Sequence, residues 1–293
     1  MKKIAFLFCF VSLNFLIQAQ ILNKKDLTSY EGFFDFFYEE STDKIFLKVE
    51  HLNKDFLYVN SLASGVGSND IGLDRGQLGN QRLVYFKKAG NKLLLVQPNL
   101  KYRANTKNTL EKKSIEQAFA RSVLFGFKIL SEKDGDYIID ITPFLMQDAH
   151  GVANRFKLKK EGTYKLDASK SALSLGRTKA FPKNIEFEAL LTFKGQPTGK
   201  NLRSVTPTAS LVSVVQHHSF IKLPDSNYKP RVFDTRSGAI SMSYFDYASP
   251  IQEDIKKQFV IRHRLEKKKP KSKKSEAKKP IIYYLDPGTP EPV

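Results

Sequence analysis

The chain has 293 residues, of which 41% are hydrophobic and 23 are phenylalanine, so it can bury a core in one large domain or two smaller ones. Its formal net charge is +18, which alone would suggest nucleic acid or an anionic surface as a partner. The charge is concentrated, however, because residues 256–279 carry 12 Lys and Arg against two acidic residues. No aromatic residue interleaves with the lysines of residues 266–279, so no base-stacking platform exists there and nucleic acid is not expected as a partner.

The first 20 residues have the pattern of a secretory signal peptide. Lys2 and Lys3 form a basic start, residues 4–17 are apolar, and a cleavage region follows at residues 18–20. The apolar run is short for a bilayer, so no stable membrane span is expected after its removal. The alternatives are an N-terminal anchor or a buried first helix. Export would place the protein in the periplasm, on the outer membrane or outside the cell.

The single cysteine, Cys9, lies within the predicted signal peptide. The mature chain would therefore contain no cysteine. Disulfides, thiolate nucleophiles and cysteine-bound zinc are excluded from it, and its stability must come from its core.

Most of the chain after residue 20 shows strand patterns. The strand-like runs are, in chain order, residues 30–38, 44–50, 56–62, 82–88, 92–97, 127–130, 137–142, 163–166, 185–193, 211–215, 219–223 and 240–247. Short turns rich in glycine and asparagine separate several of them, which indicates antiparallel hairpins. We therefore predict an α+β fold that is dominated by β-structure, mainly antiparallel sheet.

One clear helix is predicted, over about residues 114–125. An S-x-x-Q capping box opens it, in which the two side chains satisfy free amides of the first turn. Phe119, Val123 and Phe127 recur at a spacing of four, which indicates one apolar face packed against the core. Gly126 is expected to end the helix.

A glycine-rich connection between two predicted strands runs from Gly65 to Gly79 and continues into the strand that ends at Phe86. It holds five of the 16 glycines of the protein. Long loops in compact domains are usually functional or disordered. The phosphate-binding templates do not fit, because the loop has no lysine and is followed by a predicted strand. A calcium loop built from Asn69, Asp70 and Asp74 lacks the EF-hand spacing.

The loop from Gly65 to Phe86 is therefore expected to be structural, and its alternative roles are contact with a partner or ligand, or a metal site. The candidate contact residues are Gly72, Asp74, Arg75, Gly76 and Gly79. Asp74 and Arg75 are equally candidates for a local ion pair.

The histidines show no metal-binding spacing. His217 and His218 are adjacent in a predicted strand, where successive side chains point to opposite faces, so they are poor joint ligands. Asp148 and His150 are candidates for an acid–base pair, but no nucleophile motif accompanies them. No catalytic, cofactor-binding or metal-binding residue is predicted in this chain.

The C-terminal part changes composition. Residues 266–279 are typical of an exposed basic linker, and their alternative role is a surface that binds polyanions together with residues 256–265. Residues 281–286 then show a new strand pattern. We expect residues 280–293 to be the first strand of a further domain that the chain does not continue.

Several stretches, taken together and in this order, resemble a known family. They are IGLDRGQLG at 71–79, RLVYF at 82–86, VQPN at 96–99, YRA at 102–104, TKAFPKN at 178–184, QHHSF at 216–220, VIRHRLEK at 260–267 and IIYYLDPG at 281–288. They resemble the N-terminal half of secreted zinc-dependent metalloproteases that are common in Bacteroidota. Those proteins carry two uncharacterised domains ahead of a metzincin-like catalytic domain. The resemblance covers the chain from about residue 25 to its end.

The resemblance implies that residues 21–265 form a β-rich N-terminal region and that residues 280–293 begin the catalytic domain. In that family an H-E-x-x-H-x-x-G-x-x-H helix holds the zinc, downstream of the strand that residues 281–286 resemble. This sequence lacks the motif, so no catalytic residue can be assigned, and zinc is expected only in the missing domain. The chain alone is expected to be inactive.

The expected role is to support or shield that catalytic domain, which would then be the partner. The alternative is a stand-alone exported binding module that uses the loop from Gly65 to Phe86 to contact another exported protein.

Overall fold

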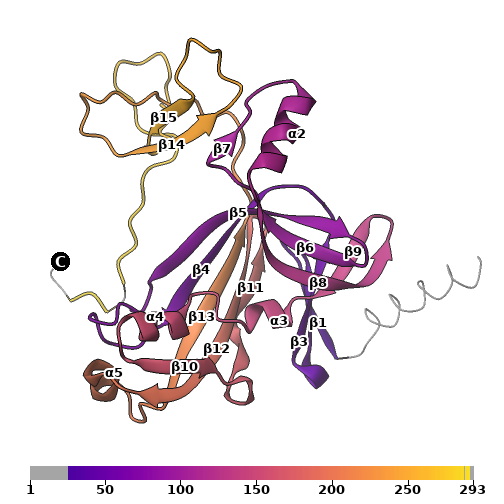
Figure 1. The fold of residues 1–293 in the computed structure, drawn as a ribbon, viewed down its shortest axis with the longest axis vertical. Helices are drawn as coiled ribbons and strands as arrows, with labels where there is room; N and C mark the ends of the chain where they lie inside the picture. The colour runs from indigo at the N-terminus through magenta and orange to yellow at the C-terminus, as the bar shows by residue number, and fades with distance from the viewer. Residues whose placement is uncertain (1–25, 287, 291–293) are drawn as a thin grey trace, which may run out of the picture. The chain divides into compact units, whose positions relative to one another are not determined.

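The computed structural model describes residues 26–286 and 288–290, so the predicted signal peptide and Cys9 lie outside the described residues. The chain divides into two compact units (Figure 1). Of the described residues, 26–99 and 120–224 form the first unit, and 100–119 with those from 225 onward form the second. The predicted boundaries at residues 20, 265 and 279 stay a prediction.

The first unit is built on one 12-stranded sheet in which neighbouring strands are antiparallel. The strand order is β1-β2-β3-β9-β8-β6-β5-β4-β13-β12-β10, and β11 also pairs with β12. The strands are β1 (Leu27–Tyr30), β2 (Phe36–Glu39), β3 (Lys44–Val49), β4 (Phe56–Ser64), β5 (Leu78–Ala89), β6 (Lys92–Gln97), β8 (Ser122–Lys133), β9 (Asp136–Asp140), β10 (Gly162–Leu166), β11 (Ala172–Phe181), β12 (Asn184–Pro197) and β13 (Leu211–Ile221). The prediction of a β-dominated, mainly antiparallel fold is confirmed.

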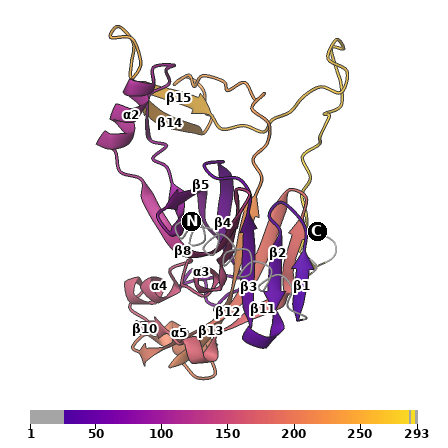
Figure 2. The same ribbon diagram turned by 90° about the vertical axis from the view of Figure 1, so that its right-hand side faces the viewer.

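Alternation of buried and exposed residues decides which face of the sheet holds the core. In β4 every second side chain from Phe56 to Leu62 is buried, and β13 alternates in the same way. The short helices α3 (Thr142–Leu145) and α4 (Val152–Leu158) pack against the sheet (Figure 2). Helix α5 (Lys200–Val205) completes the helices of this unit in the described residues.

The core of the first unit has two parts. The larger cluster is rich in phenylalanine rings that contact one another, several of them edge to face: Phe34, Phe56, Phe86, Phe127, Phe144 and Phe220. The smaller cluster contains Leu62, Val66, Ile71, Leu73, Val152, Phe156 and Leu202. The second cluster therefore takes three of its members, Val66, Ile71 and Leu73, from the glycine-rich loop.

The helix predicted over residues 114–125 is wrong in its position. Helix α2 spans Thr109–Ala118, and the Asn108 side chain caps it by accepting from the Leu110 amide. Residues from Ser122 onward belong to β8, which pairs with β6 and β9. A spacing of four residues fits one face of a strand as well as one face of a helix, and here the sheet pairing decides.

The apolar stripe assigned to that helix is wrong as well. Phe127 is buried, but from β8, and Val123 is 53% exposed. Gly126 ends no helix, because it pairs with Leu94 in the middle of the sheet. The described residues also contain α3, α4 and α5, so a fold with a single helix is too simple.

The second unit contains α2 and a three-stranded sheet in the order β15-β14-β7. Its strands are β7 (Tyr102–Arg103), β14 (Ser241–Asp246) and β15 (Lys256–Val260). Strands β14 and β15 are antiparallel, whereas β7 runs parallel to β14. Tyr102 stacks on Phe119 at 4.0 Å between ring centroids and on Phe245 at 5.5 Å, so these aromatic contacts join α2's end to the sheet.

The basic segment of residues 266–279 forms a loop closed by its own backbone. The Lys268 amide donates to the Glu276 carbonyl at 2.9 Å, and the Lys278 amide donates to the Glu266 carbonyl at 2.8 Å. The structure assigns no strand to residues 281–286. Their interpretation as the start of a further domain stays a prediction.

Candidate functional site

The glycine-rich loop connects β4 to β5, two strands that pair with each other. Backbone hydrogen bonds close it at two points. The Val66 amide donates to the Leu73 carbonyl at 2.8 Å, and the Gly76 amide donates to the Leu62 carbonyl at 2.7 Å. Because Val66, Ile71 and Leu73 are buried as well, the loop is an ordered part of the first unit.

Glycine is required in this loop for two different reasons. Gly67, Gly72 and Gly76 have φ values of 91°, 72° and 80°, in the left-handed region that side chains disfavour. Gly65 is needed for close approach, since a Cβ there would lie 2.3 Å from the Leu73 carbonyl oxygen. At Gly79 a Cβ would lie 2.3 Å from an amide nitrogen of the Asn60 side chain.

The predicted contact residues lie together on this loop and at the start of β5. Arg75 and Gly76 are exposed, whereas Gly72, Asp74 and Gly79 are half-buried. Leu78, which was not among them, is 62% exposed. Contact with a partner through these residues stays a prediction.

A polar network lies beside the loop and joins motifs that are distant in the sequence. His150 Nδ1 lies 3.1 Å from the Asn60 side-chain nitrogen, and His150 Nε2 lies 3.4 Å from the Gln77 side-chain oxygen. Arg82 donates to the Asn60 side-chain oxygen at 3.1 Å. Burial lowers the pKa of His150, which favours the neutral ring.

The network continues to the buried residue His218. Gln216 accepts from the His150 amide and donates to the Gln147 carbonyl, both at 2.9 Å. Its side-chain nitrogen lies 2.9 Å from His218 Nε2, and His218 Nδ1 lies 2.9 Å from the Tyr58 hydroxyl. Burial lowers the pKa of His218 to about 3 and raises that of Tyr58, so both are neutral at pH 7.

Asp148, the proposed acid–base partner of His150, has a different role. Its two carboxylate oxygens accept from the amides of Val152 at 2.8 Å and Ala153 at 3.0 Å. These are the first amides of α4, where a negative charge also favours the helix dipole. The carboxylate therefore holds the helix start in place.

His217 lies on the other face of β13 from His218. Its Nε2 is 2.7 Å from Glu186 and its Nδ1 is 3.1 Å from Glu188, both on the neighbouring β12. Burial alone would lower the pKa of His217, but the hydrogen bonds and charges of the two glutamates outweigh it, and the pKa is raised. For Glu186, hydrogen bonds from His217, Ser219 and Asn184 outweigh burial and lower its pKa.

Sequence spacing did not reveal this arrangement. Asn60 and Gln77 lie 90 and 73 residues from His150, and Arg82 joins the network through Asn60. Among residues 26–286 and 288–290, no group of three or more His, Cys, Asp or Glu is arranged to hold a metal ion. The arrangement supplies neutral amides, imidazoles and a hydroxyl that fix the loop to the sheet and to the segment leading into α4.

The fold and the network define a β-dominated protein of two units, with an ordered glycine-rich loop held by polar side chains. The chain belongs to the family described as a domain of unknown function, DUF5117, whose model matches residues 76–268. No curated protein and no solved structure matches the chain with significant similarity.

Proposed function

We propose that this chain is the non-catalytic N-terminal region of a secreted zinc metalloprotease-like protein and that it supports or shields the catalytic domain. The basis is the ordered set of stretches that resemble such proteins. Zinc would be held by the catalytic domain, which is the expected partner. In the part of the chain that the structure describes, no helix is long and apolar enough to cross a membrane.

The observation in the structure that supports contact with a further domain is the exposure of the segment from Ile281 to Leu285. Its five side chains are exposed by 43%, 62%, 84%, 88% and 69% in sequence order. Five consecutive apolar residues in water are unfavourable, and a strand-forming segment of this kind is stabilised by pairing with another sheet. Such pairing is what the start of a further domain would provide.

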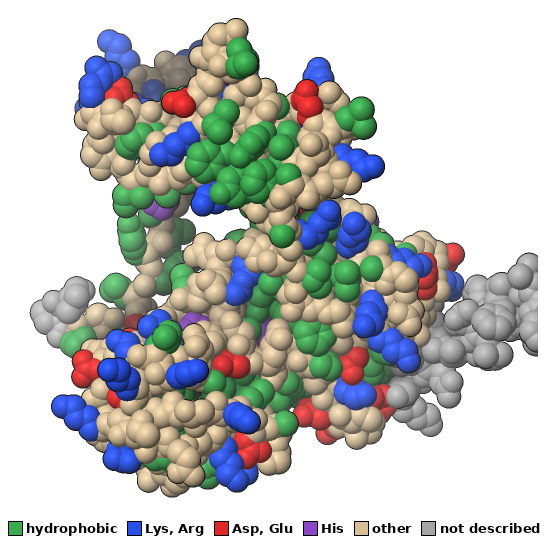
Figure 3. All heavy atoms as spheres, viewed as in Figure 1, with side chains coloured by type: hydrophobic (Ala, Val, Ile, Leu, Met, Phe, Trp, Pro, Cys, Tyr) green, Lys and Arg blue, Asp and Glu red, His purple; other side chains and the backbone are tan. Residues whose placement is uncertain are grey.

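The second unit presents further apolar side chains. Figure 3 shows hydrophobic side chains gathered on this unit, over β7 and β14. Ile240 is 75% exposed and Met242 is 55% exposed. Exposed apolar groups on a small sheet favour contact with another protein surface.

A zinc-loading and proteolysis assay tests the proposal. The purified chain, incubated with equimolar zinc, is expected to leave an unfolded protein substrate intact. Stoichiometric zinc binding together with cleavage by this chain alone would contradict it. Sequencing the DNA beyond the codon for Val293 is an independent test, in which a downstream in-frame H-E-x-x-H is expected.

The second candidate is a stand-alone exported binding module, with the loop from Gly65 to Phe86 as its contact surface. The exposure of Arg75 and Leu78 beside an ordered loop favours it. This candidate requires the purified chain to fold by itself, with one cooperative urea transition. A chain that folds only when further C-terminal sequence is added would exclude it.

A further inference from the structure

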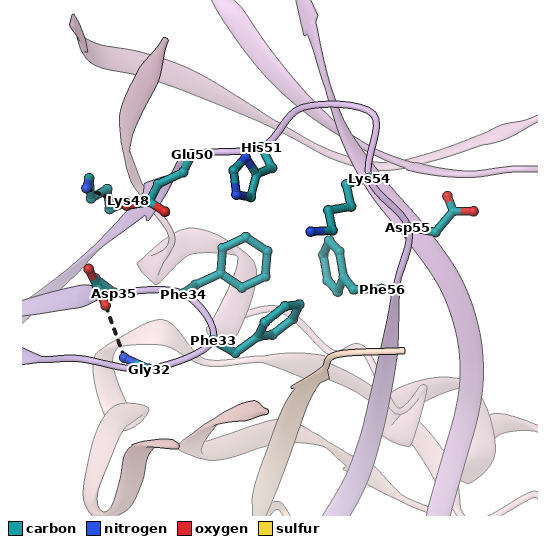
Figure 4. Close-up of a pocket in the computed structure, with 10 residues that line it drawn as sticks. All are labelled: Gly32, Phe33, Phe34, Asp35, Lys48, Glu50, His51, Lys54, Asp55 and Phe56. Atoms are coloured by element: carbon teal, nitrogen blue, oxygen red, sulfur yellow. Dashed lines mark hydrogen bonds and ion pairs between the residues drawn. The ribbon is translucent and has the colours of Figure 1, made fainter. Parts of the chain in front are cut away.

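A small pocket lies in the first unit between the turn that follows β1 and the segment that precedes β4 (Figure 4). Its volume is about 90 Å³, enough for a small apolar group. The lining residues are Gly32, Phe33, Phe34, Asp35, Lys48, Glu50, His51, Lys54, Asp55 and Phe56. They come from two segments that the sequence patterns did not single out as a site.

Three aromatic rings form the apolar part of the pocket. Phe34 contacts Phe33 at 4.6 Å and Phe56 at 5.2 Å between ring centroids, both edge to face. Phe56 is buried, but Phe33 and Phe34 are only half-buried, although their rings also contact the core. The pocket therefore offers apolar surface to a ligand.

Both segments that border the pocket are fixed by hydrogen bonds. The Phe33 amide donates to the Phe181 carbonyl at 2.8 Å, and the Gly32 amide donates to the Asp35 carboxylate at 3.0 Å. On the other side, the Asn53 amide donates to the Phe86 carbonyl at 2.8 Å. The pocket is thus preformed, which lowers the entropy cost of binding.

The charged groups at the mouth are not equivalent. Lys48 is neutralised by Glu50 at 2.5 Å and Asp136 at 3.0 Å. Figure 4 shows the side chains of Lys54 and His51 directed toward the aromatic rings, whereas the Asp55 carboxylate points away. Among the other carboxylates of the lining, Glu50 pairs with Lys48, and Asp35 accepts from the Gly32 amide. Lys54 has no ion pair among the described residues, so its ammonium favours a negatively charged group beside the rings.

We propose that this pocket binds a carboxylate joined to an apolar group, such as the C-terminal residue of a peptide with an aromatic or branched side chain. The apolar group packs against Phe33, Phe34 and Phe56. The carboxylate accepts hydrogen bonds from the Lys54 ammonium and the His51 ring. This inference is independent of the proposed function, because the pocket is complete within the first unit.

Titration of the full chain with N-acetylphenylalanine, followed by two-dimensional NMR, tests the inference. Binding in the millimolar range is expected for so small a ligand, and N-acetylphenylalaninamide, which lacks the charge, is expected to bind at least about fivefold more weakly. Resonances of Phe33, Phe34 and Lys54 should shift. Equal binding of acid and amide, or no saturable shift of these resonances, would overturn the proposal.

Two lysine variants make the test specific. Lys54 is exposed, so the variant Lys54→Gln should fold normally. It is expected to weaken binding of N-acetylphenylalanine by about fivefold or more and to leave binding of the amide unchanged. Lys194→Gln removes an exposed charge on β12 and is expected to leave binding unaltered. If both variants lose the same binding affinity, the effect comes from net charge, which would contradict the assignment of Lys54 to the carboxylate.

A further experiment with peptides shows whether the carboxylate belongs to a peptide C-terminus or to a small carboxylic acid. A tetrapeptide ending in phenylalanine is compared with the same peptide carrying a C-terminal amide. Tighter binding of the free-acid peptide supports a peptide terminus as the ligand. Binding of N-acetylphenylalanine alone supports a small carboxylic acid.

Discussion

His217 and His218 are adjacent in β13, yet their surroundings shift their pKa values in opposite directions. His218 is fully buried among Tyr58 and Phe144, and its hydrogen-bond partners among the described residues are all uncharged. His217 lies between two glutamates. The two rings therefore affect the pH dependence of stability with opposite sign.

We predict that His218 makes the protein less stable in mild acid. Its pKa is lowered to about 3 in the folded state, so the unfolded chain binds the extra proton as the pH falls below 6.5. Between pH 7 and pH 5 this removes about 2 kcal/mol from the free energy of unfolding. His217, whose pKa is raised, stabilises the fold below its unfolded pKa and loses that effect as the pH rises. The lowered pKa of Glu186 stabilises the fold above the unfolded value of 4.5, and this effect is lost only as the pH falls below that value.

Urea unfolding at the two pH values measures this dependence. His218→Gln is expected to lose stability at pH 7, because the contact with Tyr58 changes, and to show a smaller loss between pH 7 and pH 5 than the wild type. NMR titration of the imidazole groups gives a second readout, in which His218 stays neutral throughout this range. A variant that keeps the full wild-type pH dependence would contradict the assignment to His218.

The glycines of the loop give a second prediction for single residues. Gly65→Ala places a Cβ 2.3 Å from the Leu73 carbonyl oxygen and 2.8 Å from the Arg75 nitrogen, both of them backbone atoms. Backbone atoms cannot move aside as the end of a flexible side chain can. Urea unfolding is therefore expected to show a free energy of unfolding that is lower by about 2 kcal/mol or more. Gly176→Ala is the control, because its Cβ meets nothing within 4 Å and its φ is not positive. If the two variants are equally stable, the backbone does not approach Gly65 as closely as the structure shows.

Single-residue features were predictable where one local rule decides them. The glycine cluster marked a constrained loop, and alternation along a strand placed His217 and His218 on opposite faces. The partners of His150 were not predictable, because Asn60 and Gln77 reach it across sequence separations of 90 and 73 residues. They meet only in the folded sheet, where the Gln216 side chain of β13 also accepts from the His150 amide.

At the level of elements, the sequence predicted the hairpins that have short turns. It did not predict the pairing of strands that are distant from each other in the chain. The β5–β6 and β8–β9 hairpins follow the turn residues of the sequence. Strand β11 was missed, because many of its side chains are exposed and its pairing with β12 is irregular. The helix predicted over residues 114–125 does not form as expected. The segment Ser122–Lys133 is stabilised more by pairing with two strands than by an apolar helical face.

Helix α4 allows a test of how an element is held in place. Asp148→Ala removes both acceptors of the first amides of α4 and is expected to lower the free energy of unfolding by about 1–2 kcal/mol. Asp148→Asn keeps one acceptor oxygen and should lose clearly less. Thermal and urea unfolding of the two variants measure the difference. If asparagine is as damaging as alanine, or if neither change matters, the capping role is wrong.

At the level of the whole chain, the two units do not follow the linear order of the sequence. Residues 100–119 join residues from 225 onward, and they interrupt the first unit between β6 and β8. The composition of residues 100–119 did not indicate a separate unit, because the sequences of their strand and helix do not differ in kind from those of the first unit. The parallel pairing of β7 with β14 joins residues about 140 positions apart and has no local signal.

The distribution of lysines predicts where the folded chain is first cleaved by trypsin. Lys268, Lys271, Lys273 and Lys274 are exposed in the loop of residues 266–279, which only a few backbone hydrogen bonds close. Lysines within the 12-stranded sheet lie on hydrogen-bonded strands that must open before a protease can bind them. Limited digestion followed by mass spectrometry is therefore expected to show the earliest cuts after these four lysines. Replacing all four with glutamine should delay the first cleavage, whereas early cuts in β4, β12 or β13 would mean that the sheet opens more readily than the basic loop.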